Sequence, residues 1–336
     1  MPDDELLISV VVPVYNVEKY LNECLDSIFD PAARSALYEV IAVNDGSTDQ
    51  SRAILETYKK YANFRLFDQE NQGQGVARNL GIKQARGKYI FFVDSDDYLR
   101  AGAMGTMLTH AASSESDIIE FDHVNYYENT AKFAESKKKN NFPAGICEGK
   151  LLYGRGFWYA VWARLYRREM LVDHSLYFYP GIMFEDFEWS PRCFFYARAV
   201  EYHRDTLYIY RIRPGSTMNS AMGKRACLDS LTIADEFVAF RKTIEAIPEN
   251  TPFDRELGNT ISAAVKAAIR RMYRCVPPEE RPPIMEKIKA RRHLLAQGTS
   301  LKDKLRYYLT RRLPPEIAFR AYDITDALLP WKRKKR

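Results

Sequence analysis

Apolar and polar residues alternate in blocks along the first hundred residues, and the blocks follow two different periods. Short apolar runs rich in β-branched and aromatic residues predict strands, whereas apolar residues repeating every three or four positions predict helices. The predicted strands are 7–12, 38–43, 64–68 and 89–93, and the predicted helices are 17–29, 50–61 and 75–85. Continuous apolar strands that alternate with helices indicate βαβ units and a mostly parallel sheet.

The pattern changes after residue 100. Residues 101–220 are richer in aromatic residues and less regular. From Gly223 onward the periodicity is helical, and proline pairs at 277–278 and 282–283 interrupt it. The predicted helices of this part are 228–247, 257–273 and 284–295. The sequence therefore predicts a helical C-terminal region, and it shows no internal repeat.

Positive charge is concentrated at the C-terminal end. The 336 residues carry a formal net charge of +6, and residues 300–336 alone hold eleven Lys or Arg and four Asp or Glu. Basic residues mixed with aromatic and aliphatic ones suit an anionic membrane surface. The alternative is a packed C-terminal helix with a solvated basic end. Binding to nucleic acid would rest on this tail alone, so we expect no nucleic-acid partner.

The five cysteines indicate a reducing compartment. Their number is odd and no two form a C-x-x-C pair, which argues against a disulfide framework and against a cysteine-based zinc site. The acidic start of the chain is unlike a signal peptide, and the longest apolar runs fall far short of the roughly 20 residues that span a bilayer. We therefore expect a cytoplasmic protein, either soluble or peripheral on the inner face of the membrane.

Three polar clusters directly follow three of the predicted strands, at residues 15–16, 44–49 and 94–97. Because ligands of parallel sheets bind at the carboxyl ends of the strands, the three clusters should share one edge. The last cluster, Asp94-Ser95-Asp96-Asp97, holds three carboxylates within four residues. Carboxylates this close repel one another, and a bound Mg²⁺ or Mn²⁺ ion relieves the repulsion while it also binds substrate phosphates. The alternative is an acidic turn before a helix.

The other two clusters offer groups that suit a nucleotide base. Asp45, at the end of a strand, can accept a hydrogen bond from a base N–H. Tyr15 can stack on the base, as aromatic side chains do. The alternatives are a turn with a helix N-cap at Ser47 or Thr48, and ordinary packing of the tyrosine.

A segment with several glycines, residues 71–81, adds a candidate phosphate ligand. Its glycines allow close approach of the backbone, and Arg78 is a candidate for binding a diphosphate. The segment lacks the G-x-G-x-x-G pattern, so a Rossmann dinucleotide site has no support. A P-loop ATPase is also disfavoured, because the chain has no Walker A motif.

Together, these segments resemble the bacterial family 2 glycosyltransferases of capsule and lipopolysaccharide synthesis, which have the GT-A fold. The matching segments are 10–16, 40–49, 71–81 and 87–97. The resemblance implies an α/β fold with a central, mostly parallel mixed sheet and a helical C-terminal extension. It implies a transferase domain over 1–220, with a nucleotide-sugar half at 1–100 and an acceptor half at 101–220. Residues 221–336 would form the helical region with its basic amphipathic tail.

The same resemblance assigns roles in the donor site. Asp45 would contact the base, and the other residues at the first strand end would line the base and ribose pocket, namely Pro13, Tyr15 and Asn16. Asp94 and Asp96 would form the D-x-D pair, with Asp96 the better ligand for Mn²⁺ or Mg²⁺. Family 2 members most often use UDP-sugars, so the resemblance favours UDP as the nucleotide.

In the acceptor half, the resemblance points to a Glu-Asp pair within residues 184–189. Asp186 would be the general base, and the aromatic residues around it would raise its pKa by desolvation. The alternative is that Glu185 and Asp186 begin a helix, since acidic residues favour the first turn. Candidate acceptor contacts are Glu185, Trp162 and Trp189, with core packing as the alternative for either tryptophan.

Two arginines near the end of this half complete the predicted site. Arg211 and Arg213 close a strand-like run and are candidates for binding the diphosphate, with a solvated edge strand as the alternative. The chain has neither the Q-x-x-R-W motif nor the membrane helices of processive members, which favours transfer of one or a few sugars.

The predicted function is therefore inverting sugar transfer from a nucleotide-diphosphate donor to a glycan or lipid-linked acceptor. A nucleotidyltransferase would need a basic, glycine-rich start of its first helix, and the chain begins that helix at Val17-Glu18-Lys19. A catalytically degenerate scaffold of the same fold would lack Asp96 or Asp186, and both are present.

Overall fold

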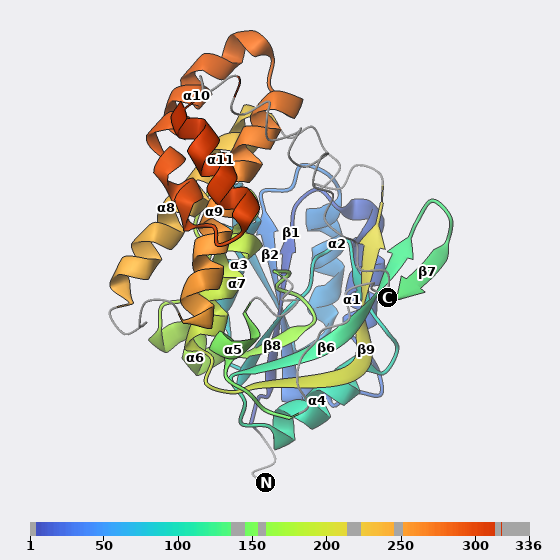
Figure 1. Ribbon diagram of the computed structural model, residues 1–336. Helices are drawn as coiled ribbons and strands as arrows, with labels where there is room; N and C mark the ends of the chain where they lie inside the picture. The colour runs from blue at the N-terminus through green and yellow to red at the C-terminus, as the bar shows by residue number, and fades with distance from the viewer. Residues whose placement is uncertain are drawn as a thin grey trace. The chain divides into compact units, whose positions relative to one another are not determined.

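The predicted strands of the first hundred residues form the parallel part of one mixed sheet. The computed structural model describes residues 5–135, 145–153, 159–213, 223–244, 251–312 and 317. Within them, β1 (Ile8–Val14) pairs in parallel with β2 (Tyr38–Asp45) and β4 (Tyr89–Phe92), and β2 pairs with β3 (Phe64–Gln69). These strands lie between flanking helices, which explains why their sequences are almost continuously apolar (Figure 1).

Helix α1 (Glu18–Ile28) covers one face of this sheet. Its buried residues recur at helical spacing and share a core with alternate residues of β1. They are Leu21, Cys24, Leu25 and Ile28 from α1, and Val10, Val12 and Val14 from β1. Helix α2 (Ser51–Thr57) follows β2, and a short 3₁₀ turn, Tyr58–Lys60, replaces the end of the helix predicted over 50–61.

Helix α3 (Gln74–Gln84) packs on β1 and β2 through a glycine. A Cβ added at Gly81 would lie 2.2 Å from Cγ1 of Val11, so only glycine allows this close approach. The contact fixes the N-terminal end of α3 above the carboxyl ends of the strands. This is the end that carries the predicted segment 71–81.

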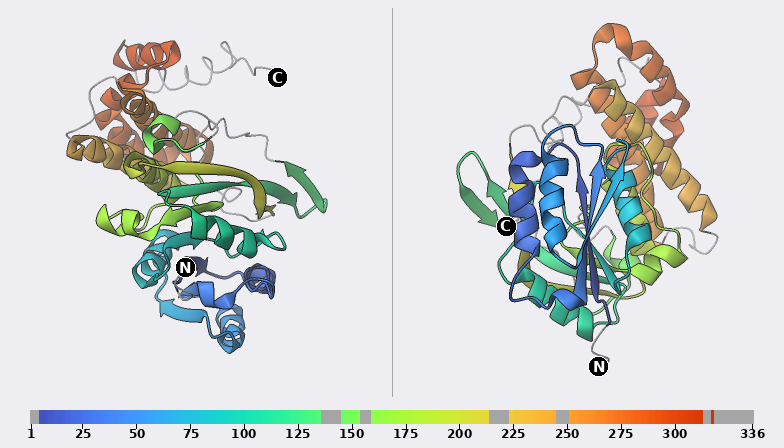
Figure 2. Two further views of the ribbon diagram at one scale, coloured as in Figure 1. Left: turned by 90° about the horizontal axis from the view of Figure 1, so that it is seen from below. Right: turned by 180° about the vertical axis from the view of Figure 1, so that it is seen from behind.

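Antiparallel pairings join the second half of the sheet to the first. β8 (Arg164–Arg167) pairs with β4 and with β6 (Ile118–Tyr127), both antiparallel, and β6 then runs parallel to the long β9 (Val200–Ile212). Within the described residues the strand order is β3-β2-β1-β4-β8-β6-β9-β5, where β5 is Tyr98–Leu99, and β7 (Lys132–Glu135) pairs with β6. Figures 1 and 2 show β9 curving along β6 and the β6–β7 hairpin extending away from the sheet. The predicted mixed α/β sheet is confirmed.

The sequence pattern did not predict the remaining strands and helices of residues 1–219. The strands are β5 (Tyr98–Leu99) and β7 (Lys132–Glu135). The helices are α4 (Ala103–Ser113), α5 (Gly149–Leu152), α6 (Arg168–Asp173) and α7 (Glu185–Tyr196). Helix α7 is the element that carries Glu185 and Asp186.

Residues 1–219 and 220–336 form two compact units, and the second is helical, as predicted. Its helices are α8 (Lys224–Thr243), α9 (Pro252–Cys275), α10 (Arg281–Ala290) and α11 (Leu301–Arg312). The pair Pro282-Pro283 lies in the first turn of α10, where proline costs no hydrogen bond, so it starts a helix and does not interrupt one. The helix predicted over 284–295 therefore begins earlier, and it gives way to a 3₁₀ segment, Arg292–Gln297.

Among the described residues, no helix is both long enough and apolar enough to cross a bilayer. The basic end of the tail, residues 318–336, lies outside the described part of the chain.

Candidate functional site

A cleft of about 480 Å³ opens at the carboxyl ends of β1, β2 and β4. A volume of this size is typical of sites for small molecules. Of the thirteen residues that the sequence singles out, eleven line this cleft. They are Pro13, Tyr15, Asp45, Arg78, Asp94, Asp96, Trp162, Glu185, Asp186, Arg211 and Arg213. The other two, Asn16 and Trp189, do not line it.

Asp45 shapes the wall of the cleft that follows β3. Its Oδ1 accepts hydrogen bonds from Gln69 Nε2 at 2.7 Å and from the Gln72 amide at 2.9 Å, and its Oδ2 accepts one from the Gly73 amide at 2.9 Å. The carboxylate is 3% exposed and anchors the loop that leads into α3. Contact with a nucleotide base stays a prediction for this residue.

Two residues of the loop after β1, Tyr15 and Asn16, differ in their contacts. Tyr15 is 46% exposed and lines the cleft, as its predicted stacking role requires. Asn16 instead joins two loops, because its Oδ1 accepts a hydrogen bond from the Thr48 amide at 2.7 Å and its own amide donates to Ser47 Oγ. Its side chain thus helps to fix the loop after β2, and its contact with the donor stays a prediction.

Arg78 joins the two halves of the cleft. One guanidinium nitrogen lies 2.6 Å from Asp94 Oδ1 and the other lies 2.6 Å from Glu185 Oε1. The side chain is only 3% exposed, so both pairs are shielded from water. A buried cation that holds one carboxylate from each half fixes their separation. The predicted contact between Arg78 and a diphosphate stays a prediction.

The acidic segment after β4 divides into two groups. Asp94 and Asp96 line the cleft, whereas Asp97 is 1% exposed and lies behind them. Asp97 accepts hydrogen bonds from the Tyr208 hydroxyl and the Arg211 amide, each at 2.7 Å, and burial raises its pKa well above its ordinary value. This carboxylate therefore ties the segment to β9.

The two carboxylates in the cleft fit a divalent cation. Oδ1 of Asp94 accepts hydrogen bonds from Arg78 and Gln74. Oδ2 of Asp96 accepts hydrogen bonds from Arg213 at 2.8–2.9 Å. The second oxygen of each carboxylate has no donor from another of the described residues. Burial, and then the charge of Asp94, raise the pKa of Asp96. A cation between the two groups would relieve this repulsion, and oxygen ligands are those that Mg²⁺ and Mn²⁺ take.

Glu185 and Asp186 begin helix α7 on the opposite side of the cleft. The preceding residue, Phe184, caps the helix in the left-handed region at φ 63°. Asp186 is partly buried, and its Oδ1 accepts a hydrogen bond from the Phe187 amide. Burial and the nearby Glu185 raise the pKa of Asp186 to about 7. A carboxyl group with this pKa suits a general base near neutral pH.

Backbone strain is gathered around this cleft. Three of the five described non-glycine residues with positive φ stand next to site residues: Asn16 at 49°, Ala163 at 59° and Phe184 at 63°. Such conformations cost about 1–3 kcal/mol each and cluster where a side chain must be aimed. They follow Tyr15 and Trp162 and precede Glu185.

The two tryptophans have different roles. Trp162 lines the cleft, and its ring stacks on Tyr208 at 4.7 Å and on Tyr210 at 5.2 Å between centroids. Trp189 is fully buried, stacks on Phe178, and donates its indole N–H to the Leu176 carbonyl. The predicted acceptor contact of Trp189 is therefore wrong, since its face of α7 turns toward the sheet.

The two C-terminal arginines line the cleft but are already engaged by the protein. Arg211 donates to Glu23 and to the Asp96 carbonyl at 2.8 Å, and its guanidinium lies 4.9 Å from the Tyr98 ring. Arg213 pairs with Asp96. Neither forms part of a solvated edge, which was the alternative for this strand end.

Three residues of the site gave no sequence signal. Gln74 donates to Asp94 Oδ1, Tyr208 accepts the Asp94 amide hydrogen bond, and Tyr210 lines the cleft. Tyr208, Tyr210 and Ile212 are alternate residues of β9, so they lie on the same face of the sheet. The sequence alone does not show whether this face meets the cleft.

Comparisons with known proteins identify the family of the chain. Residues 9–174 match the family described as Glycosyl transferase family 2. The chain is 38% identical over 221 residues to EpsH of Bacillus subtilis, covering 62% of each chain. It is 32% identical over 225 residues to the glycosyltransferase GlyG of Streptococcus pneumoniae, covering 64% of this chain and 73% of GlyG. The match thus spans less than two thirds of the length of EpsH.

A solved structure shares the fold. The chain is similar to residues 1–349 of Staphylococcus aureus TarS, crystallised in complex with UDP-GlcNAc, with a TM-score of 0.74 and 22% identity. The alignment covers 96% of this chain and 92% of that one. At this identity the likeness concerns the fold.

Proposed function

The chain belongs to glycosyltransferase family 2, and on that premise we propose that it is an inverting glycosyltransferase. It has the GT-A type fold that its sequence predicts. It moves a sugar from a nucleotide-diphosphate donor to a hydroxyl group of a glycan or lipid-linked acceptor in cell-surface polysaccharide synthesis. The observation that carries the proposal is the meeting of Asp94, Asp96 and Asp186 in one cleft, where Arg78 pairs with both Asp94 and Glu185.

The donor side of the cleft suits a nucleoside diphosphate. We assign the base and ribose to Tyr15 and Asp45, which line the cleft, and the phosphate oxygens to the N-terminal end of α3 at Gln74. Asp96 and Asp94 would hold Mn²⁺ or Mg²⁺, which supplies positive charge to the departing diphosphate. We take UDP as the nucleotide, because TarS, which shares the fold, was crystallised with UDP-GlcNAc.

The acceptor side supplies the base. Asp186 accepts the proton of the acceptor hydroxyl as that oxygen forms a bond to the anomeric carbon of the sugar. The bond from this carbon to the diphosphate breaks, and its electron pair leaves with the nucleotide. No covalent intermediate with the protein is needed, so the configuration inverts. We assign the acceptor sugar to the small part of the Trp162 ring that stays exposed at the cleft, since the residue is 7% exposed and otherwise packs in the core.

Thermal unfolding with nucleotides tests the donor side. The protein is melted with UDP, GDP, dTDP or CMP, each with and without Mn²⁺. A ligand at 100 times its Kd adds about 2.7 kcal/mol of stability, which is a readily measured shift. We expect UDP with Mn²⁺ to stabilise the protein and Asp96→Asn to abolish the metal-dependent part of the shift.

Asp173→Asn is the matched control, because it removes an exposed carboxylate of α6 that does not line the cleft. It should keep the full UDP and Mn²⁺ response. A larger shift with another nucleotide would change the donor assignment and leave the site in place. If no nucleotide shifts the protein, the degenerate scaffold becomes the better explanation.

We also propose that the basic tail brings the enzyme to the inner face of the cytoplasmic membrane, where a lipid-linked acceptor lies. Its net charge supports attraction to anionic lipids. The test is sedimentation with anionic liposomes, comparing the full chain with a chain truncated after Arg312, which keeps α11. Equal sedimentation of the two proteins would refute the role of the tail.

A further inference from the structure

A second group of metal-ligating side chains lies away from the cleft. His110, in the last turn of α4, meets His203 and Asp205 of β9, and one ligand atom from each lies within 4.8 Å of the other two. The two imidazole rings are 3.8 Å apart between centroids. Asp205 precedes Arg211 by six residues on an extended strand, a span of about 20 Å. None of the three residues lines the cleft.

The spacing of the ligand atoms fits a metal ion. His110 Nε2 lies 3.2 Å from Asp205 Oδ2. Two ligands bound tetrahedrally to Zn²⁺ at about 2.0–2.1 Å are about 3.3–3.4 Å from each other. This hydrogen-bonded pair therefore already has the separation of two ligands on one ion, and zinc would replace the proton between them.

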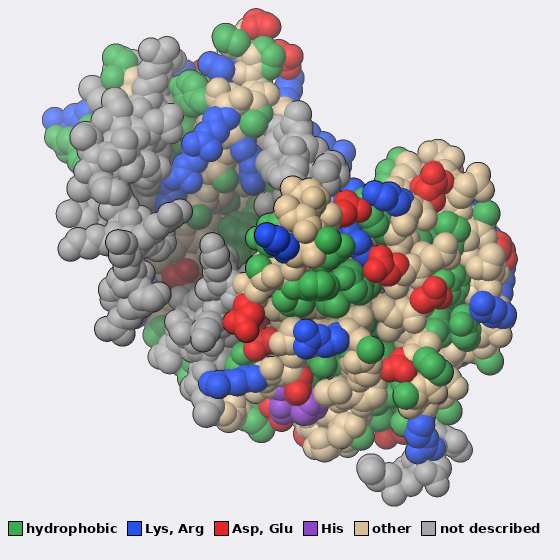
Figure 3. All heavy atoms as spheres, turned by 90° about the vertical axis from the view of Figure 1, so that its right-hand side faces the viewer, with side chains coloured by type: hydrophobic (Ala, Val, Ile, Leu, Met, Phe, Trp, Pro, Cys, Tyr) green, Lys and Arg blue, Asp and Glu red, His purple; other side chains and the backbone are tan. Residues whose placement is uncertain are grey.

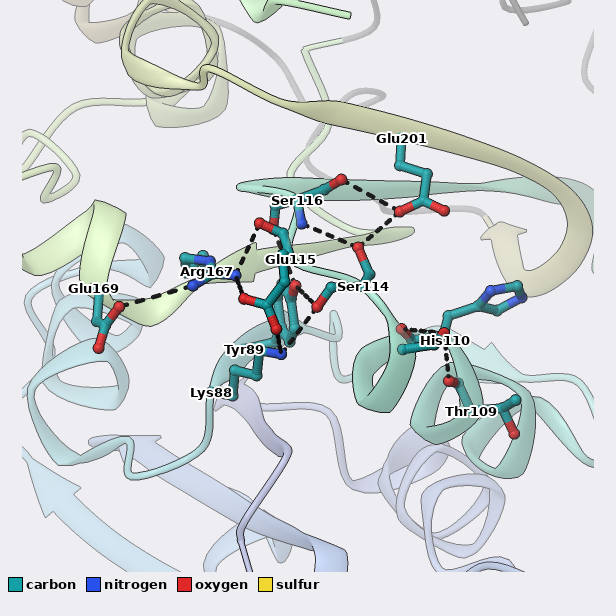
Figure 4. A network of polar contacts seen from close by, with 11 residues as sticks. Lys88, Tyr89, Thr109, His110, Ser114, Glu115, Ser116, Arg167, Glu169 and Glu201 are labelled. Atoms are coloured by element: carbon teal, nitrogen blue, oxygen red, sulfur yellow. Dashed lines mark hydrogen bonds and ion pairs between the residues drawn. The ribbon is translucent and has the colours of Figure 1, made fainter. Parts of the chain in front are cut away.

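A carboxylate behind His203 orients that ring. His203 Nε2 lies 2.9 Å from Glu201 Oε1, and the other oxygen of Glu201 accepts hydrogen bonds from Ser114 Oγ at 2.7 Å and Ser116 Oγ at 3.3 Å. Figure 4 shows Glu201 held by these two serines, with His110 nearby on α4. A neutral His203 that donates Nε2–H to Glu201 presents Nδ1 as a lone pair. Metal-binding histidines commonly have such a carboxylate partner.

An irregularity of β9 places the third ligand. The pairing of β6 with β9 steps from Phe121 opposite His203 to Asp122 opposite Thr206. Arg204 and Asp205 are therefore extra residues without partners in this pairing, and they form a bulge. Bulges re-aim side chains and are common beside functional sites.

The group is accessible to an ion from solution. The exposed side-chain fractions are 22% for His110, 24% for His203 and 47% for Asp205. Histidine side chains lie beside acidic ones at the surface in the space-filling view of Figure 3. An open entry path and partial burial of the imidazoles together suit a site that binds and exchanges a cation.

We propose that His110, His203 and Asp205 bind one Zn²⁺ ion, with Glu201 orienting His203 and water completing the coordination. Two imidazole nitrogens and one carboxylate oxygen are a ligand set that zinc favours. The ion links the end of α4 to β9, and the expected effect is stabilisation of this part of the fold. The site is separate from the carboxylate pair of the cleft.

Metal analysis of the full-length chain, freed of any affinity tag, tests the proposal. The metal-free protein is equilibrated with ZnCl₂ and bound zinc is counted for the wild type and for His110→Ala, His203→Ala and Asp205→Asn. We expect each histidine variant to bind one equivalent fewer than the wild type. Zinc should raise the melting temperature of the wild type by several degrees and leave that of His203→Ala unchanged.

His293→Ala is the matched control, because it removes an exposed imidazole of the second unit. It should behave as the wild type, and Asp96→Asn should keep the zinc equivalent assigned to the histidine site. Equal zinc content in the wild type and both histidine variants would overturn the proposal.

A measurement on the wild type guards against variants that fail to fold. Cu²⁺ added as a probe should show electron paramagnetic resonance splitting from nitrogen ligands, which the carboxylates of the cleft cannot give. A spectrum of oxygen ligands alone would overturn the proposal. Nitrogen splitting that survives when His174 and His293, the two exposed imidazoles outside the group, are both replaced by Ala supports it.

Discussion

Replacing Asp186 by Asn separates the chemistry of this side chain from its structural contacts. Asparagine keeps an oxygen that can accept the hydrogen bond from the Phe187 amide, and it fills nearly the same volume. What it removes is the ionisable group whose pKa is raised to about 7 by burial and by Glu185. The substitution should therefore abolish base catalysis while the start of α7 keeps its form.

The pKa sets the expected size of the pH effect on activity. With a pKa of about 7, the ionised fraction of Asp186 rises about tenfold between pH 6 and pH 8, and kcat/KM should rise by the same factor. At the ordinary pKa of 3.8 there would be no change over this range. Asp186→Asn should lower kcat/KM by about 10²–10⁴-fold, the usual contribution of a general base.

Stability should move in the opposite direction to activity. Because the folded-state pKa of Asp186 is raised, the folded protein binds this proton more tightly, and stability falls as pH rises from about 4 to about 7. A full shift of this size corresponds to about 4 kcal/mol, and the partial exposure of the group reduces the expected effect to about 1–2 kcal/mol. The variant should lack this loss and be the more stable protein at pH 8.

Urea unfolding from pH 4.5 to pH 8.5 measures the stability difference, and sugar transfer from the donor that binds gives the rates. Asp173→Asn is the control for loss of one exposed carboxylate, and its stability should track the wild type. A wild-type kcat/KM that is flat between pH 6 and pH 8, or a variant less stable than the wild type at pH 8, would refute this reasoning.

Four further substitutions, one of them a control, test the packing of the fold and of the site, each by urea unfolding. Gly81→Ala should destabilise the protein by about 3 kcal/mol or more, since the new Cβ would lie 2.2 Å from a side chain of β1. Gly105→Ala in α4 is the control: its Cβ would meet nothing within 4 Å, so it should stabilise the protein by about 0.5–1 kcal/mol. Arg78→Met should cost about 3–5 kcal/mol by leaving two carboxylates without their shared cation. Tyr208→Phe should cost about 1–3 kcal/mol, because Asp97 loses a buried hydrogen-bond donor.

The parallel part of the fold was predictable because its signals are local. Each apolar run of the first hundred residues ends at a turn or a polar cluster, so the predicted strands match the observed ones within about two residues. The middle of the chain gave no such pattern. There β6 pairs with β9 in parallel across about eighty residues of sequence, and β5 and β7 are too short to show a period. Such pairings depend on the completed sheet.

Site residues that directly follow a strand were predictable. Residues whose position depends on how a helix packs were harder to predict. Strand ends share one edge by topology, so Tyr15, Asp45 and Asp96 reach the cleft as expected. Trp162 and Trp189 are both close to Asp186 in sequence or space, and the sequence could not separate them. Trp189 lies three residues after Asp186, on nearly the same face of α7 but one turn further along the helix, and there its ring is buried against Phe178.

The arginines show most clearly what a sequence leaves open. Arg78, Arg211 and Arg213 were assigned to a diphosphate, and each is paired with a protein carboxylate. Their partners lie 16 to 188 residues away, so no spacing rule could reveal them. The physical cause is the low dielectric of the cleft, in which neighbouring carboxylates need cations. With these pairs in place the described cleft balances much of its own charge.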